Sequence, residues 1–344
     1  MKLKIAAVIA AATLALGACS AADQKGEPTT TSGGTVTVMT HDSFVLPKDL
    51  ITAWEKKSGF TLKTTSPGDG GTVLNQLILT KGAPKVDAFF GLDNFSSGRA
   101  LQEGIAEPFE TAALPDSAKQ YAEESLIPID MGDVCINVDT VWFEEKGLAV
   151  PTTLDQLTDP AYKDLLVVTN PATSSPGFAF LVATATVKPD SWEAYWTDLI
   201  KNGAKVSDSW SDAYYTDFSG ADGAGAYPLV LSYASSPAES AGDTSIMESS
   251  CIRQIEYAGV VKGAKNAEGA KEFIQFLLSD EVQKAFPTSM YMYPINPSIQ
   301  LPDEWAKYAK LMDKPIMPVS DTVVANREGW IKDWTALYEA NAGK

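Results

Sequence analysis

Four polar residues, Thr40, His41, Asp42 and Ser43, follow directly after an alternating run of valines and threonines that is typical of a β-strand. In open α/β sheets, ligands bind outside the carboxyl ends of the strands. We therefore expect Asp42 and its neighbours on the wall of a ligand-binding cleft.

The composition argues against catalysis at this position. His41 is the only histidine among the 344 residues, so a Ser-His-Asp triad or a histidine-rich zinc site would depend on it alone. No Gly-x-Ser-x-Gly elbow, Walker loop or Cys-x-x-Cys motif occurs in the sequence. His41 and Asp42 are adjacent, so on a strand their side chains would point to opposite faces. We therefore expect a protein that is not an enzyme and that carries neither a cofactor nor a metal.

Other polar and aromatic residues fall in loops after predicted strands and suit recognition. They are Asp42, Asp69, Asp93, Ser174, Trp210, Tyr214, Tyr215, Tyr233, Tyr291 and Tyr293. Rings and carboxylates around a closing cleft suit a flat organic cation, because each ring face attracts a cation by about 0.5–2 kcal/mol. The alternative is that most of these rings belong to the core. Tyr293, which precedes Pro294, is assigned to the core.

The elements that would position these residues alternate between strand and helix. The expected strands are residues 35–40, 60–64, 85–92, 128–138, 165–169, 229–233 and 253–260. Helices are expected between the first three strands, with Gly59 ending the first helix, and at residues 178–187 and 191–201. The last third is helical, with apolar faces at residues 270–277 and 330–337. This alternation predicts parallel, helix-covered sheet.

The N-terminus has the features of an export signal. Two lysines precede an apolar run at residues 5–16, which is too short to span a membrane as a helix. The next residues, Leu16-Gly17-Ala18-Cys19, resemble the bacterial lipobox, in which the cysteine is lipidated; the alternative is an ordinary signal peptide. We expect residues 1–18 to be the signal and 19–34 a flexible tether. The protein would be exported and lipid-anchored to the outer face of the cell membrane, or periplasmic.

Charge and cysteine content restrict the partners further. The net charge is −17 at pH 7, and loss of the two lysines of residues 1–18 leaves about −19. Such an acidic surface repels nucleic acid. If Cys19 is lipidated, Cys135 and Cys251 remain, and in an exported chain one such pair most simply forms a disulfide. The alternative is two buried free thiols.

The order of elements suggests two lobes with two crossings between them. We expect lobe 1 to comprise residues 35–132 and 257–344, and lobe 2 residues 133–256. Cys135 and Cys251 each fall near one crossing, so their disulfide would tie the two hinge strands together.

Several blocks of the sequence resemble the thiamine-binding proteins of ABC importers. They are residues 36–44, 69–70, 91–94, 173–177, 210–214, 231–233, 236–238 and 292–294. The resemblance implies the class II periplasmic-binding-protein fold, in which two α/β lobes with a hinge enclose an interlobe ligand cleft. It also implies a monomeric solute-binding lipoprotein that binds thiamine, thiamine phosphate or thiamine diphosphate and delivers it to a membrane permease.

The resemblance also implies roles for individual residues. Trp210 and Tyr233 would pack against the ligand's rings, Asp69, Gly70 and Ser174 would hold its polar or phosphate groups, and Asp42 would serve the aminopyrimidine or the thiazolium charge. Gly70-Gly71-Thr72 would lead into a helix, whose N–H groups can bind an anion. The complete set of predicted ligand-binding residues is Asp42, His41, Asp69, Gly70, Ser174, Trp210, Tyr214, Tyr233, Glu239 and Tyr291.

Three positions depart from the family and leave the ligand open. The family often has Tyr where His41 stands, Tyr where Glu239 stands and Trp where Tyr291 stands. Glu239 could pair with the thiazolium, or the ligand could be a different cation such as a polyamine. Related class II proteins bind ferric iron with two adjacent tyrosines and a histidine, which Tyr214, Tyr215 and His41 would supply. Adjacent tyrosines on a helix diverge by about 100°, so we expect one to point inward and one outward.

Overall fold

The computed structural model describes residues 33–221 and 223–342. The predicted signal peptide, Cys19 and nearly all of the predicted tether lie outside these residues. Within the described ranges, no helix has both the length and the apolar character that a membrane crossing requires.

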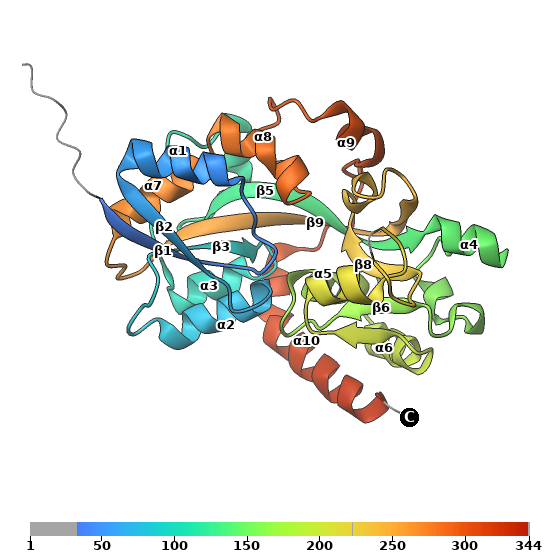
Figure 1. Cartoon of the computed structure of the whole chain (residues 1–344). Helices are drawn as coiled ribbons and strands as arrows, with labels where there is room; N and C mark the ends of the chain where they lie inside the picture. Colours follow the sequence, from blue (N-terminus) through green and yellow to red (C-terminus); the bar gives the residue numbers. More distant parts are fainter. Residues whose placement is uncertain (1–32, 222, 343–344) are drawn as a thin grey trace, which may run out of the picture. The chain divides into compact units, whose positions relative to one another are not determined.

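The first strands and helices form where the sequence predicts them (Figure 1). They are β1 (Gly34–Thr40), α1 (Lys48–Ser58), β2 (Phe60–Thr65), α2 (Gly70–Thr80) and β3 (Ala88–Asp93). β1 alternates, with Val36 and Val38 fully buried, and pairs in parallel with both β2 and β3. Gly59 ends α1 at φ 78°, a left-handed conformation that glycine adopts without strain. β3 begins at Ala88, three residues later than predicted.

The remaining elements complete one mixed sheet and its helical cover. They are α3 (Ser97–Glu103), β4 (Ala106–Glu107), β5 (Ile127–Asp139), α4 (Thr140–Lys146), β6 (Leu166–Thr169), α5 (Ser175–Val187), α6 (Trp192–Lys201), β7 (Lys205–Ser207), a π-helical turn (Asp212–Asp217), β8 (Leu229–Tyr233), β9 (Thr244–Val261), α7 (Ala267–Leu277), α8 (Asp280–Ser289), β10 (Tyr293–Pro294), α9 (Asp303–Tyr308) and α10 (Ser320–Asn341). α5 begins three residues before its predicted start, and β9 is much longer than its predicted strand at residues 253–260.

Two long antiparallel strands, β5 and β9, connect the two ends of the sheet. The strand order is β2-β1-β3-β9-β5-β8-β6-β7, with β10 added to β5 and β4 to β9. β9 pairs with β3 on one side and with β5 on the other, and β5 in turn pairs with β8. β5 and β9 have 13 and 18 residues, and they join the half of the sheet with β1 to β3 to the half with β6 and β8 (Figure 1).

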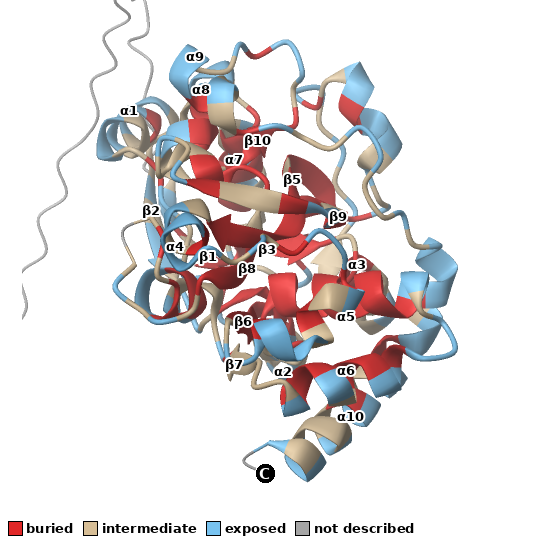
Figure 2. Ribbon diagram, turned by 90° about the vertical axis from the view of Figure 1, so that its right-hand side faces the viewer, coloured by how far each residue is buried: buried red, intermediate tan, exposed pale blue. Residues whose placement is uncertain are grey.

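The buried residues gather in two large cores. The first core surrounds β1, β3, α2 and α7, and the second surrounds β6, β8, α5 and α6. In Figure 2, α5 and the central strands appear largely as buried segments. α5 is apolar on all sides and buries 11 of its 13 residues, as a helix enclosed by protein does. The faces predicted at residues 270–277 and 330–337 both pack inward.

The C-terminal helix differs from its predicted lobe assignment. α10 packs against α6 and α5, and Trp334 meets Trp196 edge to face with ring centroids 5.6 Å apart. This helix therefore belongs with the second core, whereas residues 257–344 were assigned to lobe 1. Periodicity predicted that α10 has an apolar face, but it contains no information about which core that face covers. The remaining lobe boundaries stay a prediction.

A disulfide joins Cys135 on β5 to Cys251 on β9. The pairing expected from the cysteine count is therefore confirmed. Both cysteines are buried, so the bond lies inside the body between the two long strands.

Candidate functional site

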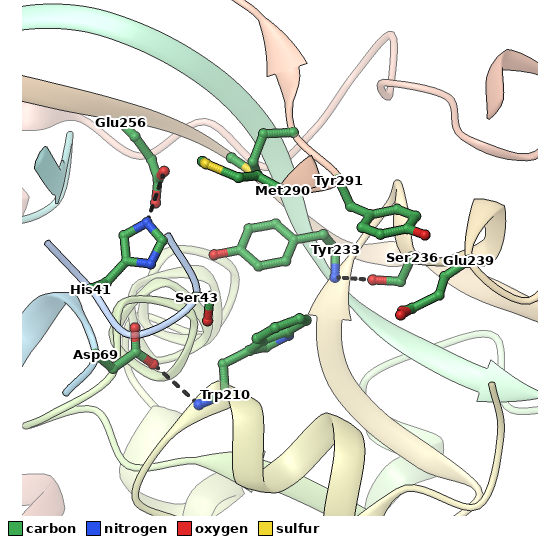
Figure 3. A pocket seen from close by; sticks show the side chains of 11 residues that line it. His41, Ser43, Asp69, Trp210, Tyr233, Ser236, Glu239, Glu256, Met290 and Tyr291 are labelled. Atoms are coloured by element: carbon green, nitrogen blue, oxygen red, sulfur yellow. Dashed lines mark hydrogen bonds and ion pairs between the residues drawn. The ribbon is translucent and has the colours of Figure 1, made fainter. Parts of the chain in front are cut away.

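A pocket lies where the carboxyl end of β1 meets the loops after β7, β8 and α8 (Figure 3). It is lined by His41, Ser43, Asp69, Trp210, Tyr233, Ser236, Glu239, Glu256, Met290, Tyr291 and Met292. Its volume is about 40 Å³, enough for two or three water molecules. Ligand sites for small molecules usually measure some 300–1,000 Å³, so a ligand of that size requires the walls to move apart.

Six of the ten predicted ligand-binding residues line this pocket. They are His41, Asp69, Trp210, Tyr233, Glu239 and Tyr291. They come from segments up to 250 residues apart in the chain, and the loops at strand ends bring them together, as expected for an α/β sheet.

The aromatic wall is held in place from behind. The Trp210 indole N–H donates to Ser232 Oγ at 2.9 Å, and the ring of Tyr214 stacks on Trp210 at 5.1 Å and 14°. Tyr233 lies 6.2 Å from Trp210 at 64°, and its hydroxyl accepts a hydrogen bond from Gln254 Nε2 at 3.2 Å. Tyr214 is buried and does not line the pocket, so it supports Trp210.

One end of the pocket, which we call the buried end, carries His41 and Glu256. His41 Nε2 lies 3.7 Å from Glu256 Oε2, and both residues are buried. Burial by itself lowers the pKa of His41, but the charge of Glu256, with smaller contributions from Asp69 and Asp42, outweighs it and raises that pKa. A positive imidazole is therefore favoured next to the negative carboxylate.

Glu256 was not among the predicted site residues. It stands alone in an apolar part of β9 that continues to Val261, and a carboxylate in a buried strand is the kind of polar residue that requires explanation. Its register partner on β5, Asp130, is likewise a buried carboxyl residue, between Ile129 and Met131. Both could have been noticed in the sequence.

Asp69 connects the two sides of the pocket. One carboxylate oxygen accepts from Gly70 N at 2.8 Å and so caps α2, and the other accepts from the backbone N–H of Trp210 at 3.2 Å. Burial raises the pKa of Asp69 above its ordinary value, while hydrogen bonds from Ser174 and Gly70 act against this rise.

The start of α2, which was predicted to bind an anion, touches the loop before α5. The Thr72 N–H donates to Thr173 O at 3.1 Å, and the Gly70 N–H is taken by Asp69. A Cβ on Gly71 would lie 2.7 Å from Thr173 O, so only glycine permits this approach. The N–H groups of Gly70 and Thr72 are therefore already hydrogen-bonded at this helix end, and its predicted role in holding an anion stays a prediction.

Three further predicted residues lie outside the pocket lining. Asp42 is exposed at the edge, where Ser211 Oγ donates to its Oδ1 at 3.5 Å. Ser174 is fully buried and donates to Thr169 Oγ1 at 2.9 Å. Gly70 belongs to the contact between α2 and the α5 loop. Asp93, from the wider polar set, is buried and accepts from Ser96 N at 2.8 Å, so it stabilises its own turn.

The proposed iron ligands do not all line one pocket. Tyr214 is buried, whereas Tyr215 is 44% exposed and its ring stands at 87° to that of Tyr214. One tyrosine is thus buried and the other exposed, as predicted, and neither ring lines the pocket that contains His41. Tyr293 is buried in a small core with Trp305, as predicted. Among the residues that the structure describes, no three His, Cys, Asp or Glu side chains are grouped to hold a metal.

The family model of the bacterial extracellular solute-binding proteins matches residues 83–316. The chain belongs to this family. This solute-binding protein is 29% identical over 315 residues to the thiamine-binding periplasmic protein of Escherichia coli K12. The matched region covers 87% of this chain and 92% of that protein.

Solved structures agree with this assignment. A periplasmic thiamin binding protein matches with a TM-score of 0.78 at 27% identity, covering 88% of this chain and 96% of the other. The iron-bound HitA of Pseudomonas aeruginosa matches with a TM-score of 0.70 at 18% identity, covering 87% and 99%. At that identity the second match shows a shared fold alone. The predicted periplasmic-binding-protein fold of this solute-binding protein is confirmed.

Proposed function

We propose that this chain binds thiamine outside the cytoplasm and delivers it to an ABC permease in the membrane. The observation that carries the proposal is the pocket itself, which combines the rings of Trp210, Tyr233 and Tyr291 with three carboxylates. Thiamine is a flat cation, and stacked rings and acid groups are the chemistry that recognises such a ligand. The similarity of this chain to the thiamine-binding periplasmic protein of Escherichia coli K12 and to a periplasmic thiamin binding protein of known structure supports the same ligand.

The charge of the pocket supports a cationic ligand over an anionic one. Asp69, Glu239 and Glu256 face the pocket, and the described lining residues include His41 but no lysine or arginine. Phosphate-binding sites normally use such basic side chains or free N–H groups at a helix start. We therefore expect thiamine to bind at least as tightly as its mono- and diphosphate.

Binding in this proposal is coupled to movement of the two cores. The pocket of about 40 Å³ is walled by residues from both sides of the body, so thiamine enters after these sides separate. Closure over the ligand then restores contacts such as Asp69 to Trp210 N. Ligand shifts this equilibrium only through contacts that it makes better in the closed form.

A thermal-shift and calorimetry screen tests the ligand. The panel contains thiamine, its mono- and diphosphate, spermidine and ferric citrate, and we expect the largest stabilisation with thiamine. A ligand at a hundredfold excess over its Kd stabilises the folded form by about 2.7 kcal/mol. Stabilisation by ferric citrate with a visible colour, and none by thiamine, would refute the proposal in favour of iron.

The attachment to the membrane is part of the same proposal. We expect Cys19 to carry lipid and to tether the body near its permease. Mass spectrometry of the protein purified from membranes should find a lipidated N-terminal cysteine, and Cys19→Ala should release the protein from the membrane. An unmodified Cys19 inside a soluble precursor would contradict the anchor and leave thiamine binding unaffected.

A further inference from the structure

The buried end of the pocket contains two polar atoms without hydrogen bonds. Glu256 Oε1 accepts from Gln254 Nε2 at 3.1 Å, whereas neither Glu256 Oε2 nor His41 Nε2 has a hydrogen-bond partner among the described residues. The two atoms lie 3.7 Å apart, too far for a hydrogen bond, and their side chains both line the pocket (Figure 3). Glu256 is only 4% exposed, so bulk water does not satisfy it.

A second carboxyl group, that of Asp130, lies behind Glu256. It lies opposite Glu256 in the β5–β9 register and is fully buried. Burial and the charge of Glu256 raise the pKa of Asp130 well above its ordinary value. Of the two carboxyl groups, only that of Glu256 lines the pocket.

The pair of atoms therefore offers an acceptor beside a donor. Glu256 Oε2 accepts, and the Nε2–H of His41, which is present when the imidazole is protonated, donates. Leaving such buried groups without hydrogen bonds costs free energy. A ligand that forms both hydrogen bonds therefore binds much more tightly than one that cannot. The complementary ligand edge has an amino group next to a ring nitrogen that accepts.

We propose that Glu256 and His41 form a subsite that reads the aminopyrimidine edge of the ligand. The amino group donates to Glu256 Oε2, and the adjacent ring nitrogen accepts from His41 Nε2. This inference rests on the proposed function, since thiamine has an aminopyrimidine ring. It assigns the opposite end of the pocket, with Glu239 and Tyr291, to the cationic ring.

The inference is tested by comparing three ligands on the wild-type protein. Oxythiamine has an oxo group in place of the amino group and carries a proton on the adjacent ring nitrogen, so its edge shows the reversed pattern of donor and acceptor. Pyrithiamine keeps the aminopyrimidine and changes the cationic ring. Calorimetry should find pyrithiamine within about tenfold of thiamine and oxythiamine at least 100-fold weaker. Equal affinities for thiamine and oxythiamine would overturn the subsite, without any variant being made.

Two matched variants then show which end of the pocket distinguishes thiamine from oxythiamine. Glu256→Gln removes the charge at the buried end, and the thiamine-to-oxythiamine ratio should fall at least tenfold. Glu239→Gln removes the same charge from the other end, so both ligands should weaken by similar factors and the ratio should persist. A ratio that falls equally in both variants would overturn the assignment. Unliganded melting temperatures show whether either variant is misfolded.

The proposed function and the subsite fail in different ways. If the wild-type protein binds none of the three ligands, the proposed function is wrong. If it binds thiamine tightly but Glu256→Gln leaves the ratio unchanged, thiamine binding stands and the subsite is wrong.

Discussion

Substitution of Gly71 by alanine should block closure of the pocket without touching the ligand. A Cβ at this position would lie 2.7 Å from Thr173 O and 2.8 Å from Thr173 C, and both atoms belong to backbone that cannot rotate away. Ordinary contact begins near 3.4 Å, so α2 and the loop before α5 must separate by about 0.7 Å.

The separation breaks hydrogen bonds that join the two sides. The bond from Thr72 N to Thr173 O would lengthen from 3.1 Å to about 3.8 Å, and the bond from Trp210 N to Asp69 from 3.2 Å to about 3.9 Å. The first contributes about 1 kcal/mol and the second, to a carboxylate, about 1.5–3 kcal/mol. Their sum, about 2.5–4 kcal/mol, corresponds to a roughly 50- to 1,000-fold loss of affinity.

Calorimetry with thiamine measures this loss, and Gly329→Ala is the matched control. Gly329 also lies in a helix, α10, and nothing lies within 4 Å of a Cβ added there. Both substitutions replace a helical glycine by a better helix former, so neither should lower the melting temperature of the free protein. Thiamine binding by Gly71→Ala within threefold of wild type would refute the argument that this contact belongs to the bound form.

Three further predictions concern the aromatic wall, a buried acid and the disulfide. Trp210→Ala and Tyr233→Ala should each weaken thiamine binding at least tenfold, or about 1.4 kcal/mol, by calorimetry; two unchanged affinities would mean that the ligand lies elsewhere. Burial raises the pKa of Asp93 from 3.8 to about 6, so the folded state binds a proton more tightly than the unfolded one and stability rises as pH falls from about 6 to 4. Asp93→Asn should remove this dependence, which amounts to at most about 3 kcal/mol, in urea titrations at pH 7 and pH 4.5. If the free energies of unfolding of variant and wild type differ by the same amount at both pH values, the prediction is wrong. Replacing both Cys135 and Cys251 by serine removes a disulfide across 116 residues and should lower the free energy of unfolding by about 4–5 kcal/mol. A loss below 1 kcal/mol would show that the disulfide restricts the unfolded chain very little.

Local patterns in the sequence were sufficient to predict most elements. The alternation of β1, the glycine that ends α1 and the apolar faces of α7 and α10 depend on neighbours within one or two turns. Local patterns do not show which core α10 packs against, because a helix with Trp334 on its apolar face can cover either core. The length of β9 was also missed, since its first half alternates irregularly and is stabilised by pairing with β5.

The site was predictable where residues follow strands and not where they lie within them. His41, Asp69 and Tyr233 stand at or just beyond predicted strand ends, so the rule for open sheets found them. Trp210 follows β7, a strand of three residues that was not predicted, and its role came from the family resemblance. Glu256 lies in the middle of β9, and only its register with β5 reveals that it faces the pocket. Asp42 was predicted from its position just after the first strand, but the residue is exposed and does not line the pocket.

The position of His41 also gives the protein a built-in spectroscopic reporter. Because the sequence contains one histidine and that histidine lines the pocket, a proton NMR spectrum of the tag-free chain should show a single set of imidazole signals. Titration of any compound that reaches the buried end must shift those signals, while compounds held elsewhere leave them in place. Occupancy of this one cavity can therefore be followed in solution without isotope labels or mutation.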